Sequence, residues 1–505
     1  MQTAFFLLIP ILFVAVQVLL RLAKAIVSPL KDIPGPFWSR FTSLWYFNRV
    51  RKGQFEHDNI RLHQQYGAVV RVAPNQYSIS DASAIKTVYG TGSRFAKAAW
   101  YDGWKHPQQW SVFSDRDIKR HSETRKTFTN LYSLSSLLHY EVFVDQCAEI
   151  FTQRLDEIAD NKQTFNLGHW FQCYAFDVIG NLTFGERFGF LDRGADIDGA
   201  IEAVHKMMMY STLVGIYPEW HPRLFGFLSQ FKWSGAGGRQ YISDFVRDKI
   251  RKRGQQTDKT EKATSATTGP QDFLEKLLLA RDKNPEKVTE FHLLMMGRSN
   301  VGAGSDTTAI SLSGIMWYLL QNAEVFHKLR DEIDELTARG RCSANVTFKE
   351  SQEMPYFQAV MKEALRMHSA TGLPMWRVVP DGGAELNGRF FPAGTVVGVN
   401  TWVAHYDERI FPDAKAFRPE RWLEGESDPE RLKAMNQMYM PFGLGSRTCL
   451  GKHISILEMS KLIPRLVRDY DIVPLRKTWS TQNYWFVKPT DFEVKIQKRA
   501  QKNVA

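Results

Sequence analysis

One short stretch near the C-terminal end, residues 441–451 with the sequence PFGLGSRTCLG, constrains this chain more than any other feature. Gly443 and Gly445 allow a tight turn whose backbone can lie close to a flat object. Arg447 adds a fixed cation, and Cys449 comes just before an apolar helical pattern. At the start of a helix, unpaired N–H groups and the macrodipole favour a thiolate over a thiol. A single thiolate beside closely approaching backbone is typical of an axial ligand to haem iron.

Three other interpretations of the same stretch need to be weighed. A zinc site needs further ligands nearby, whereas the other three cysteines lie far away in the sequence. A nucleotide-binding glycine motif needs a third glycine, but Thr448 follows Gly443 and Gly445 at that position, and Thr307 follows Gly302 and Gly304. A buried structural cysteine after a glycine loop remains an open interpretation of this stretch taken alone.

A second unusual stretch interrupts a long helical pattern over residues 290–322. Residues 303–308 read AGSDTT, and most of these residue types are poor choices for a helix interior. Such a conflict with local propensity often marks a functional site. Ala303 and Gly304 permit close approach to a flat cofactor, while Asp306 and Thr307 can bond to water in a locally opened helix turn. A helix kink or cap is the alternative explanation.

With these motifs the chain resembles the cytochrome P-450 haem-thiolate monooxygenases. Phe442, Gly445, Arg447, Cys449 and Gly451 match the haem-binding loop of that family at every fixed position. The resemblance implies that the cysteine ligates the iron of haem b as a thiolate and donates electron density to it. It also implies that the rest of this loop contacts the haem.

The same resemblance assigns the stretch at 303–308 to the oxygen-binding groove of the family's long central helix. Ala303 and Gly304 would then lie against the haem, and Asp306 and Thr307 would organise water and deliver protons during oxygen activation. Taken together, this implies that the protein inserts one oxygen atom into an apolar small molecule.

Two further positions are assigned to the haem propionates by the resemblance. Residues 117–131 read as a helix, and His121 and Arg125 are four residues apart, so they share a face. By itself this spacing is more often a solvated helix face. The family often has tryptophan where this chain has His121, which still offers a donor. Arg377 stands where the family has a second propionate-binding arginine.

Glu363 and Arg366 lie three residues apart on a predicted helix. A surface ion pair is the usual meaning of such spacing, and it contributes little to stability. The resemblance implies instead a buried structural triad completed by Arg421, which comes from the later stretch FRPERW.

Two regions are expected to surround the substrate. The resemblance places an aromatic loop over the haem and a methionine-rich segment in a flexible roof, although ordinary packing or membrane contact also explains these side chains. Residues 254–271 are polar and low in complexity, which predicts a disordered surface loop. The candidate aromatic and roof residues are Trp100, Tyr101, Trp104, Trp110, Met207, Met208, Met209 and Trp220.

The fold class expected for the 505 residues is mainly α with a minor β region, the cytochrome P-450 fold behind an N-terminal transmembrane helix. Residues 1–22 are the predicted anchor, 23–40 a basic and proline-rich hinge, and 41–505 the catalytic domain. Four cysteines are too few for a disulfide framework and fit a reducing compartment. The net charge of +11 is spread along the chain, which favours an anionic membrane surface or an acidic redox partner over nucleic acid.

The anchor is predicted from residues 1–20, which carry no charge and approach the roughly 20 residues that span a bilayer. A cleaved signal peptide would have a charged start and a small-residue cleavage site. Basic residues follow the apolar run, which predicts that the rest of the chain faces the cytosol. Pro34-Gly35-Pro36 predicts a stiff, non-helical joint. We expect a single-pass protein of the endoplasmic reticulum membrane.

The chain contains no flavin or nicotinamide fingerprint, so its electrons are expected from another protein. The resemblance implies that NADPH-cytochrome P-450 reductase supplies them, with cytochrome b5 as a second candidate partner. The overall pattern is similar to filamentous-fungal members of secondary metabolism. Two alternatives remain at this stage: a reductase-independent isomerase or dehydratase of the same fold, and a non-catalytic haem-binding membrane protein.

Overall fold

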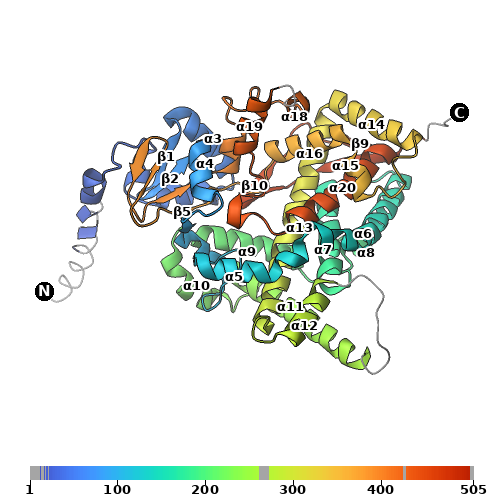
Figure 1. Ribbon diagram of the computed structural model, residues 1–505, viewed down its shortest axis with the longest axis horizontal. Coiled ribbons are helices and arrows are strands. Elements are labelled where there is room, and N and C mark those ends of the chain that lie inside the picture. The colour runs from blue at the N-terminus through green and yellow to red at the C-terminus, as the bar shows by residue number, and fades with distance from the viewer. Residues whose placement is uncertain are drawn as a thin grey trace.

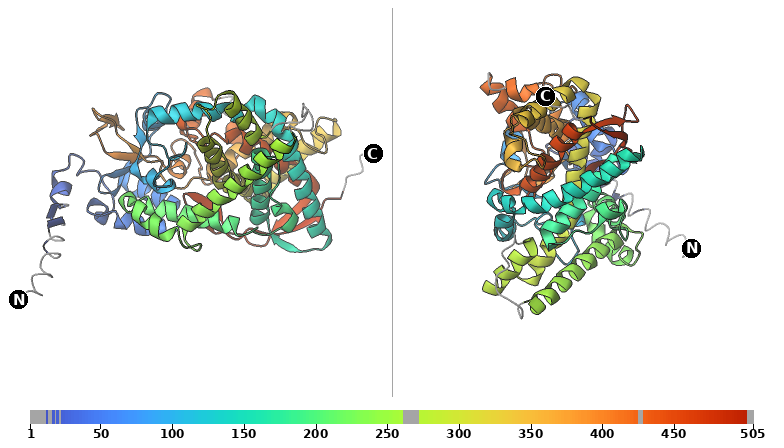
Figure 2. Two further views of the ribbon diagram at one scale, coloured as in Figure 1. Left: turned by 90° about the horizontal axis from the view of Figure 1, so that it is seen from below. Right: turned by 90° about the vertical axis from the view of Figure 1, so that its right-hand side faces the viewer.

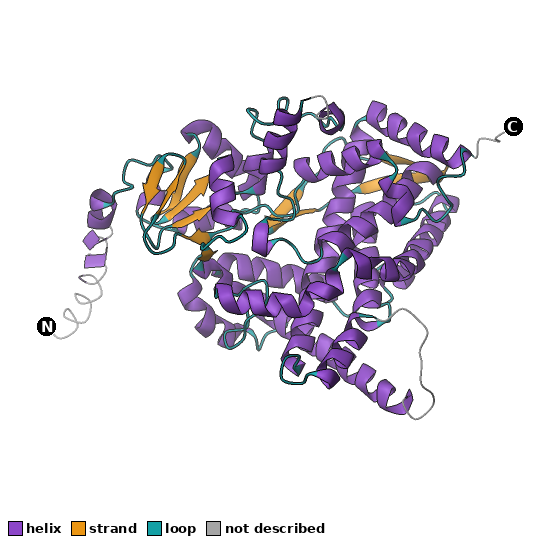
Figure 3. Ribbon diagram, viewed as in Figure 1, coloured by secondary structure: helices purple, strands orange, loops and turns teal. Residues whose placement is uncertain are grey.

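The computed structural model describes Leu12 and residues 16–17, 19–20, 22–260, 272–424 and 428–500. Helices make up most of these residues, and the strands form small sheets (Figure 3). Both observations confirm the predicted class, mainly α with a minor β region. The helices before the centre of the chain are α2 Leu44–Arg51, α3 Phe55–Tyr66, α4 Ala82–Tyr89, α5 Ile118–Thr129, α6 Leu134–Asp160, α7 Leu167–Phe184, α8 Phe190–Arg193, α9 Ala200–Val214, α10 His221–Leu228, α11 Gly235–Thr260 and α12 Phe273–Lys283.

The 32-residue helix α13 (Glu290–Gln321) runs through the middle of the molecule (Figure 1). It is buried on nearly every side because apolar and small residues surround its axis. The helices that follow it are α14 Ala323–Ala338, α15 Phe348–Gln352, α16 Pro355–Met367, α17 Thr401–His405, α18 Glu420–Leu423, α19 Pro429–Met438 and α20 Lys452–Asp469. Helices α7, α16 and α20 pack directly against α13.

A five-stranded sheet of order β1-β2-β8-β5-β3 lies at one end of the molecule, on the left in Figure 1. The predicted strands near residues 68–72 and 77–80 are β1 and β2, which pair antiparallel with Val69 opposite Ile79. The strands are β1 Val69–Ala73, β2 Gln76–Ile79, β3 Ala96–Lys97, β4 Thr164–Asn166, β5 Arg377–Val378, β6 Ala384–Leu386, β7 Arg389–Phe391, β8 Val396–Gly398, β9 Tyr470–Pro474, β10 Thr481–Tyr484, β11 Phe486–Pro489 and β12 Glu493–Lys498.

Two apolar cores hold these layers together. The larger core lies around α6, α7, α13, α16 and α20, and the smaller one lies between the five-stranded sheet and helices α4 and α19. The stretch 441–451 comes directly before α20, and its residues Phe442, Leu444 and Leu450 pack against these cores. The haem-binding loop of the sequence analysis is therefore held between the helical body and the sheet end.

The N-terminal part of the chain projects from the sheet end of the molecule (Figure 2). The joint at Pro34 and Gly35 is non-helical as predicted, and the carbonyl of Pro34 accepts a hydrogen bond from the N–H of Arg71 at 2.8 Å. Most of the predicted anchor, residues 1–22, lies outside the described residues. In the part of the chain that the structure describes, no helix is both long and apolar enough to cross a membrane.

The predicted loop at 254–271 begins later than expected. Helix α11 continues to Thr260, so the first residues of that segment are helical and the prediction is wrong for them. Gln255, Gln256 and Lys259 are good helix formers, and the long helix before them removes the cost of nucleation. Residues 261–271 lie outside the described part of the chain.

Candidate functional site

The loop that precedes α20 turns twice through the left-handed region of backbone space. Gly443 has φ of 68° and Gly445 has φ of 59°, which glycine adopts without strain. A Cβ atom at Gly445 would lie 2.2 Å from the carbonyl oxygen of Tyr89, at the end of α4. Glycine at this position therefore serves both the turn and the close packing of the loop against the sheet end.

Cys449 lies at the end of this loop, and its N–H donates to the carbonyl of Phe442 at 2.8 Å. Protein atoms surround the sulfur on all sides, yet the side chain remains accessible, so it faces an interior space. Because α20 has no side-chain N-cap, the N–H groups of Gly451 and Lys452 bond to the sulfur. Arg125 adds a favourable charge.

Burial nevertheless outweighs these groups and raises the pKa of Cys449 above its usual value. The two N–H groups favour the thiolate as predicted, but desolvation penalises the charged sulfur more than they stabilise it. A metal cation bound to the sulfur would remove that penalty. The donor set, one inward-facing sulfur with backbone N–H bonds, fits haem iron.

The remaining cysteines cannot compete for this role. Cys147, Cys173 and Cys342 are all buried, and burial raises the pKa of each thiol, to about 12 for Cys173. Each packs into the larger apolar core as a small hydrophobic residue.

Basic side chains from four separate segments gather beside the loop. Arg447 donates from Nη1 to the carbonyl of Asp115 at 2.8 Å, whereas its Nη2 is buried and has no partner. Burial, with the charge of Arg377, lowers the pKa of Arg447 to about 10. The cluster consists of Lys97 on β3, His121 and Arg125 on α5, Arg377 on β5, and Arg447 in η6 (Gly445–Arg447).

The members of this cation cluster repel one another. Burial, together with the charges of Arg447, Lys97 and Arg125, lowers the pKa of His121 to about 3, so its ring is neutral. Among the described residues, the carboxylate that acts on several of these groups belongs to Asp115, and it already forms an ion pair with Arg120 at 2.6 Å. Buried cations without carboxylates need an anionic ligand. A cofactor that carries two carboxylates, as haem does, fits this cluster.

Four members of this cluster were predicted from the sequence, whereas Lys97 was not. Its ammonium group is buried, donates to the carbonyl of Phe113, and lies 4.3 Å from the ring centres of Tyr101 and Phe113. A lysine beside small residues in a short strand gives no sequence signal, because its burial depends on rings that arrive from other segments.

The polar stretch of α13 remains a continuous helix. Thr307 donates from Oγ1 to the carbonyl of Ala303 at 2.8 Å, so the hydroxyl bonds back to the preceding turn and the turn does not open as expected. Asp306 is buried and points elsewhere, because adjacent residues on a helix are about 100° apart. Its carboxylate accepts from the amide of Gln172 and lies 3.4 Å from the ammonium of Lys488.

Helices α13 and α20 are joined next to this stretch. Thr308 donates from its hydroxyl to Ser455 at 3.2 Å, which fixes the polar turn of α13 relative to the helix that starts after Cys449. Ala303 is exposed although the residues on either side of it are mostly buried. Its face of α13 therefore borders an interior space, as the groove prediction requires.

The three predicted members of the structural triad meet in the core. Glu363, Arg366 and Arg421 have no exposed side-chain surface, and both arginines lie 2.9 Å from the same carboxylate oxygen. Trp422 also donates to this carboxylate at 2.9 Å. The spacing thus marks a buried network, not a surface pair.

His405 connects this triad to the loop and was missed from the sequence. Arg366 donates to the carbonyl of His405 at 2.8 Å, and Nε2 of His405 accepts the N–H of Met440 at 3.0 Å, one residue before the loop. Burial lowers the pKa of His405 to about 3, so the ring is neutral and Nδ1 donates to the carbonyl of Arg366. The triad therefore fixes the start of the loop.

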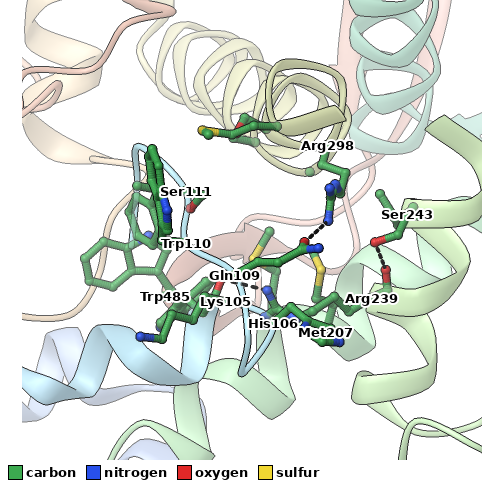
Figure 4. Close-up of a pocket in the computed structure, with 18 of the residues that line it drawn as sticks. Lys105, His106, Gln109, Trp110, Ser111, Met207, Arg239, Ser243, Arg298 and Trp485 are labelled. Atoms are coloured by element: carbon green, nitrogen blue, oxygen red, sulfur yellow. Dashed lines mark hydrogen bonds between the residues drawn. The ribbon is translucent and has the colours of Figure 1, made fainter. Parts of the chain in front are cut away.

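A cavity borders the exposed face of α13 (Figure 4). Trp104 and Trp110 line it, as the resemblance implied, whereas Trp100 and Tyr101 are buried in the core. Met207 and Met208 also line it, while Met209 and Trp220 lie at the surface. Its other walls come from α11, from α13 at Gly302 and Ala303, and from the turn at Trp485 and Phe486.

These features define a class of protein: residues 33–495 match the cytochrome P-450 family, and the chain belongs to it. The protein is a haem-dependent enzyme of the P-450 monooxygenase type, in which a cysteine thiolate holds the haem and a redox partner supplies the electrons.

Several relatives match almost the whole chain. A pisatin demethylase of Fusarium vanettenii is 37% identical over 97% of this chain and 93% of its own length. A cytochrome P-450 monooxygenase of Aspergillus terreus is 34% identical over 92% of this chain and 95% of its own length. A third relative, a cytochrome P-450 monooxygenase of Emericella nidulans, is 34% identical over 93% of this chain and 94% of its own length.

Proposed function

We propose that Cys449 is the thiolate ligand of the haem and that the cation cluster holds the two haem propionates. The observation that carries this proposal is the convergence of an inward-facing sulfur with buried basic groups that have too few carboxylates. Arg447, with its unpartnered Nη2, would bind one propionate, and Arg377 and Lys97 stand beside it.

Bound haem supplies the activation of O2 and the transfer of one oxygen atom to the substrate. The residues of α13 would manage the protons that this chemistry consumes. Thr307 can hold a water molecule with its hydroxyl, whose acceptor lone pairs are free while its proton bonds to Ala303. Asp306 would exchange protons with Lys488, which is partly exposed, and so connect the interior to solvent.

The substrate would be a small molecule of fungal secondary metabolism, bound in the cavity beside Ala303. The relatives support a small-molecule substrate, since one of them is a demethylase of pisatin. The apolar rings and thioethers of the cavity wall suit a largely apolar body.

The carbon monoxide difference spectrum tests the ligand assignment. The reduced full-length protein should give the red-shifted Soret band of thiolate ligation, and Cys449→Ala should lose it. Cys342→Ala is the matched control and should keep the band. A Cys449→Ala protein with an unchanged spectrum would show that another group ligates the iron.

We further propose that residues 1–22 anchor the protein in the endoplasmic reticulum membrane, with the catalytic domain in the cytosol. NADPH-cytochrome P-450 reductase would supply electrons there, with cytochrome b5 as a second donor. The uncharged apolar run supports the anchor, and so do Phe37 and Trp38, which are 66% and 62% exposed just after the joint. Protease added to intact microsomes should degrade the catalytic domain; a fully protected domain would reverse this topology.

A further inference from the structure

Two arginines face the cavity without a carboxylate to neutralise them. Arg239 on α11 and Arg298 on α13 both line it, and Figure 4 shows them on the same side of the space. No aspartate or glutamate is among the described residues that line the cavity, and neither arginine forms an ion pair with a described residue. The third lining cation, Lys105, is neutralised by Asp102 at 2.8 Å.

Arg298 is held by neutral groups only. Its Nε donates to the carbonyl of Leu294 at 3.1 Å, and its Nη1 donates to the amide oxygen of Gln109 at 2.9 Å. Burial lowers its pKa, and the nearby charge of Arg247 lowers it further. Gln109 belongs to the aromatic loop, so its amide is a weak and replaceable partner for a guanidinium that can bind a carboxylate with two parallel bonds.

Arg239 is fixed more firmly than Arg298. It donates to the carbonyl of Trp104 at 2.6 Å and to the hydroxyl of Ser211 at 2.6 Å, which ties the aromatic loop to α9 and α11. All of its partners are neutral, and burial lowers its pKa to about 10, with repulsion from Arg298 adding to the effect. Its charge therefore reaches the cavity uncompensated.

Most of the remaining side chains that line the cavity are apolar. Arg298 lies five residues before Ala303 on α13, so about 7 Å of helix rise separates the charged end from the end beside the haem groove. A ligand that fits both ends has an anionic group at one end and an apolar, ring-sized body at the other. The apolar wall is made of Trp110, Phe113, Met207, Met295, Trp485 and Phe486.

We propose that the substrate carries a carboxylate, which Arg298 binds in place of Gln109, while the charge of Arg239 stabilises it and the apolar body extends to Ala303. This inference rests on the proposed function, because it assigns the substrate class of the same site. The protein would then oxidise apolar carboxylic acids, at a carbon atom that lies at the end of the substrate remote from the carboxylate.

Equilibrium dialysis of the full-length holoenzyme tests the proposal without turnover. The probes are matched pairs of increasing size, naphthalene-2-carboxylate with its carboxamide and biphenyl-4-carboxylate with its carboxamide. At least one carboxylate should bind about tenfold or more tightly than its neutral partner, the usual size of a charge-assisted bond. Arg298→Gln should abolish that preference, and Arg298→Lys should restore part of it.

Arg247→Gln is the matched control, since it removes the same charge from an exposed residue of α11 that does not line the cavity. It should keep the preference for the acid. A set of pairs in which no carboxylate binds more tightly than its amide overturns the proposal, as does a preference that survives in Arg298→Gln. The carbon monoxide spectrum of each variant separates this failure from failure of the proposed function, because a red-shifted Soret band shows that the haem site is intact.

Discussion

Two groups of buried charges in this protein are built in opposite ways. In the triad, Glu363 receives Arg366 and Arg421, and Trp422 donates to the same carboxylate. In the cation cluster, the basic groups face one another, and Nη2 of Arg447 is left without a partner. Both groups are largely buried, but only the triad is complete in the sense that each of its cations contacts a carboxylate directly.

This difference in pairing distinguishes a group of charges that stabilises the fold from a group that can bind a ligand. In a complete network the hydrogen bonds offset the cost of desolvating the charges, so the network can fix the position of a segment. The triad fixes the start of the haem-binding loop in this way, through His405. An incomplete network is unfavourable until a ligand of opposite charge arrives. Asp306 lies between these cases, because Gln172 and the half-buried Lys488 bind it only on one side.

The largest effect should come from breaking the complete network. Arg421→Ala leaves Glu363 buried with one partner fewer, so the free energy of unfolding should fall by about 3–5 kcal/mol. Urea unfolding and the yield of carbon monoxide-binding protein measure this loss. Arg418→Ala, in the same segment but part of a half-exposed pair, should cost less than about 1 kcal/mol. An equal loss of unfolding free energy in the two variants would show that the buried triad stabilises the fold no more than a half-exposed ion pair does.

The next largest effect should come from Thr307→Ala. The variant should bind haem and still consume NADPH with reductase, but product per NADPH should fall by about tenfold or more, because the hydroxyl that positions a proton-carrying water is lost. Hydrogen peroxide should rise in step. Thr308→Ala is the control, since this neighbour bonds to Ser455 in the core, and it should stay coupled. Tight coupling in Thr307→Ala with weaker substrate binding would assign Thr307 to the pocket.

A smaller effect of opposite character should follow from Arg447→Gln. Removal of one repelling cation should leave the fold as stable as before, while haem should dissociate about tenfold faster because a charge-assisted bond is lost. Transfer of haem to apomyoglobin measures the rate. Arg116→Gln, which removes an exposed partner of Asp102, should leave it unchanged. A loss of unfolding free energy as large as in Arg421→Ala would mean that the cation cluster stabilises the fold and does not serve to bind haem.

The smallest effect should come from His121→Gln. Because burial and three neighbouring cations lower the pKa of His121 to about 3, its ring is neutral at every working pH and offers one N–H donor to a propionate. An amide keeps a donor, so haem dissociation should change less than about threefold, by under 1 kcal/mol. The change should also be the same at pH 6 and pH 8. A step between these pH values would show that the ring carries charge when haem is bound.

The local elements of the fold were predictable from the sequence. Helix α5, capped by Asp117, and the long helix α13 occupy their predicted residues, and the strands β1 and β2 pair as a hairpin where valine, tyrosine and isoleucine favour strands. The end of α11 was predicted wrongly, because a polar composition favours an exposed helix as readily as a loop. The closed form of the polar turn in α13 was also unexpected, because bonds such as that of Thr307 to Ala303 leave the helix intact.

The sequence by itself identified the family and the candidate haem-binding and proton-handling stretches, because each is a contiguous motif whose residue types and spacing are recognisable without the fold. Only the tertiary structure brought Lys97 to the cation cluster, joined His405 to the loop, and paired Asp306 with Lys488. The same holds for the two uncompensated arginines of the cavity. These groups come from segments far apart in the chain. Whether a buried charge is paired within the protein or needs a ligand of opposite charge depends on which side chains the fold places beside it.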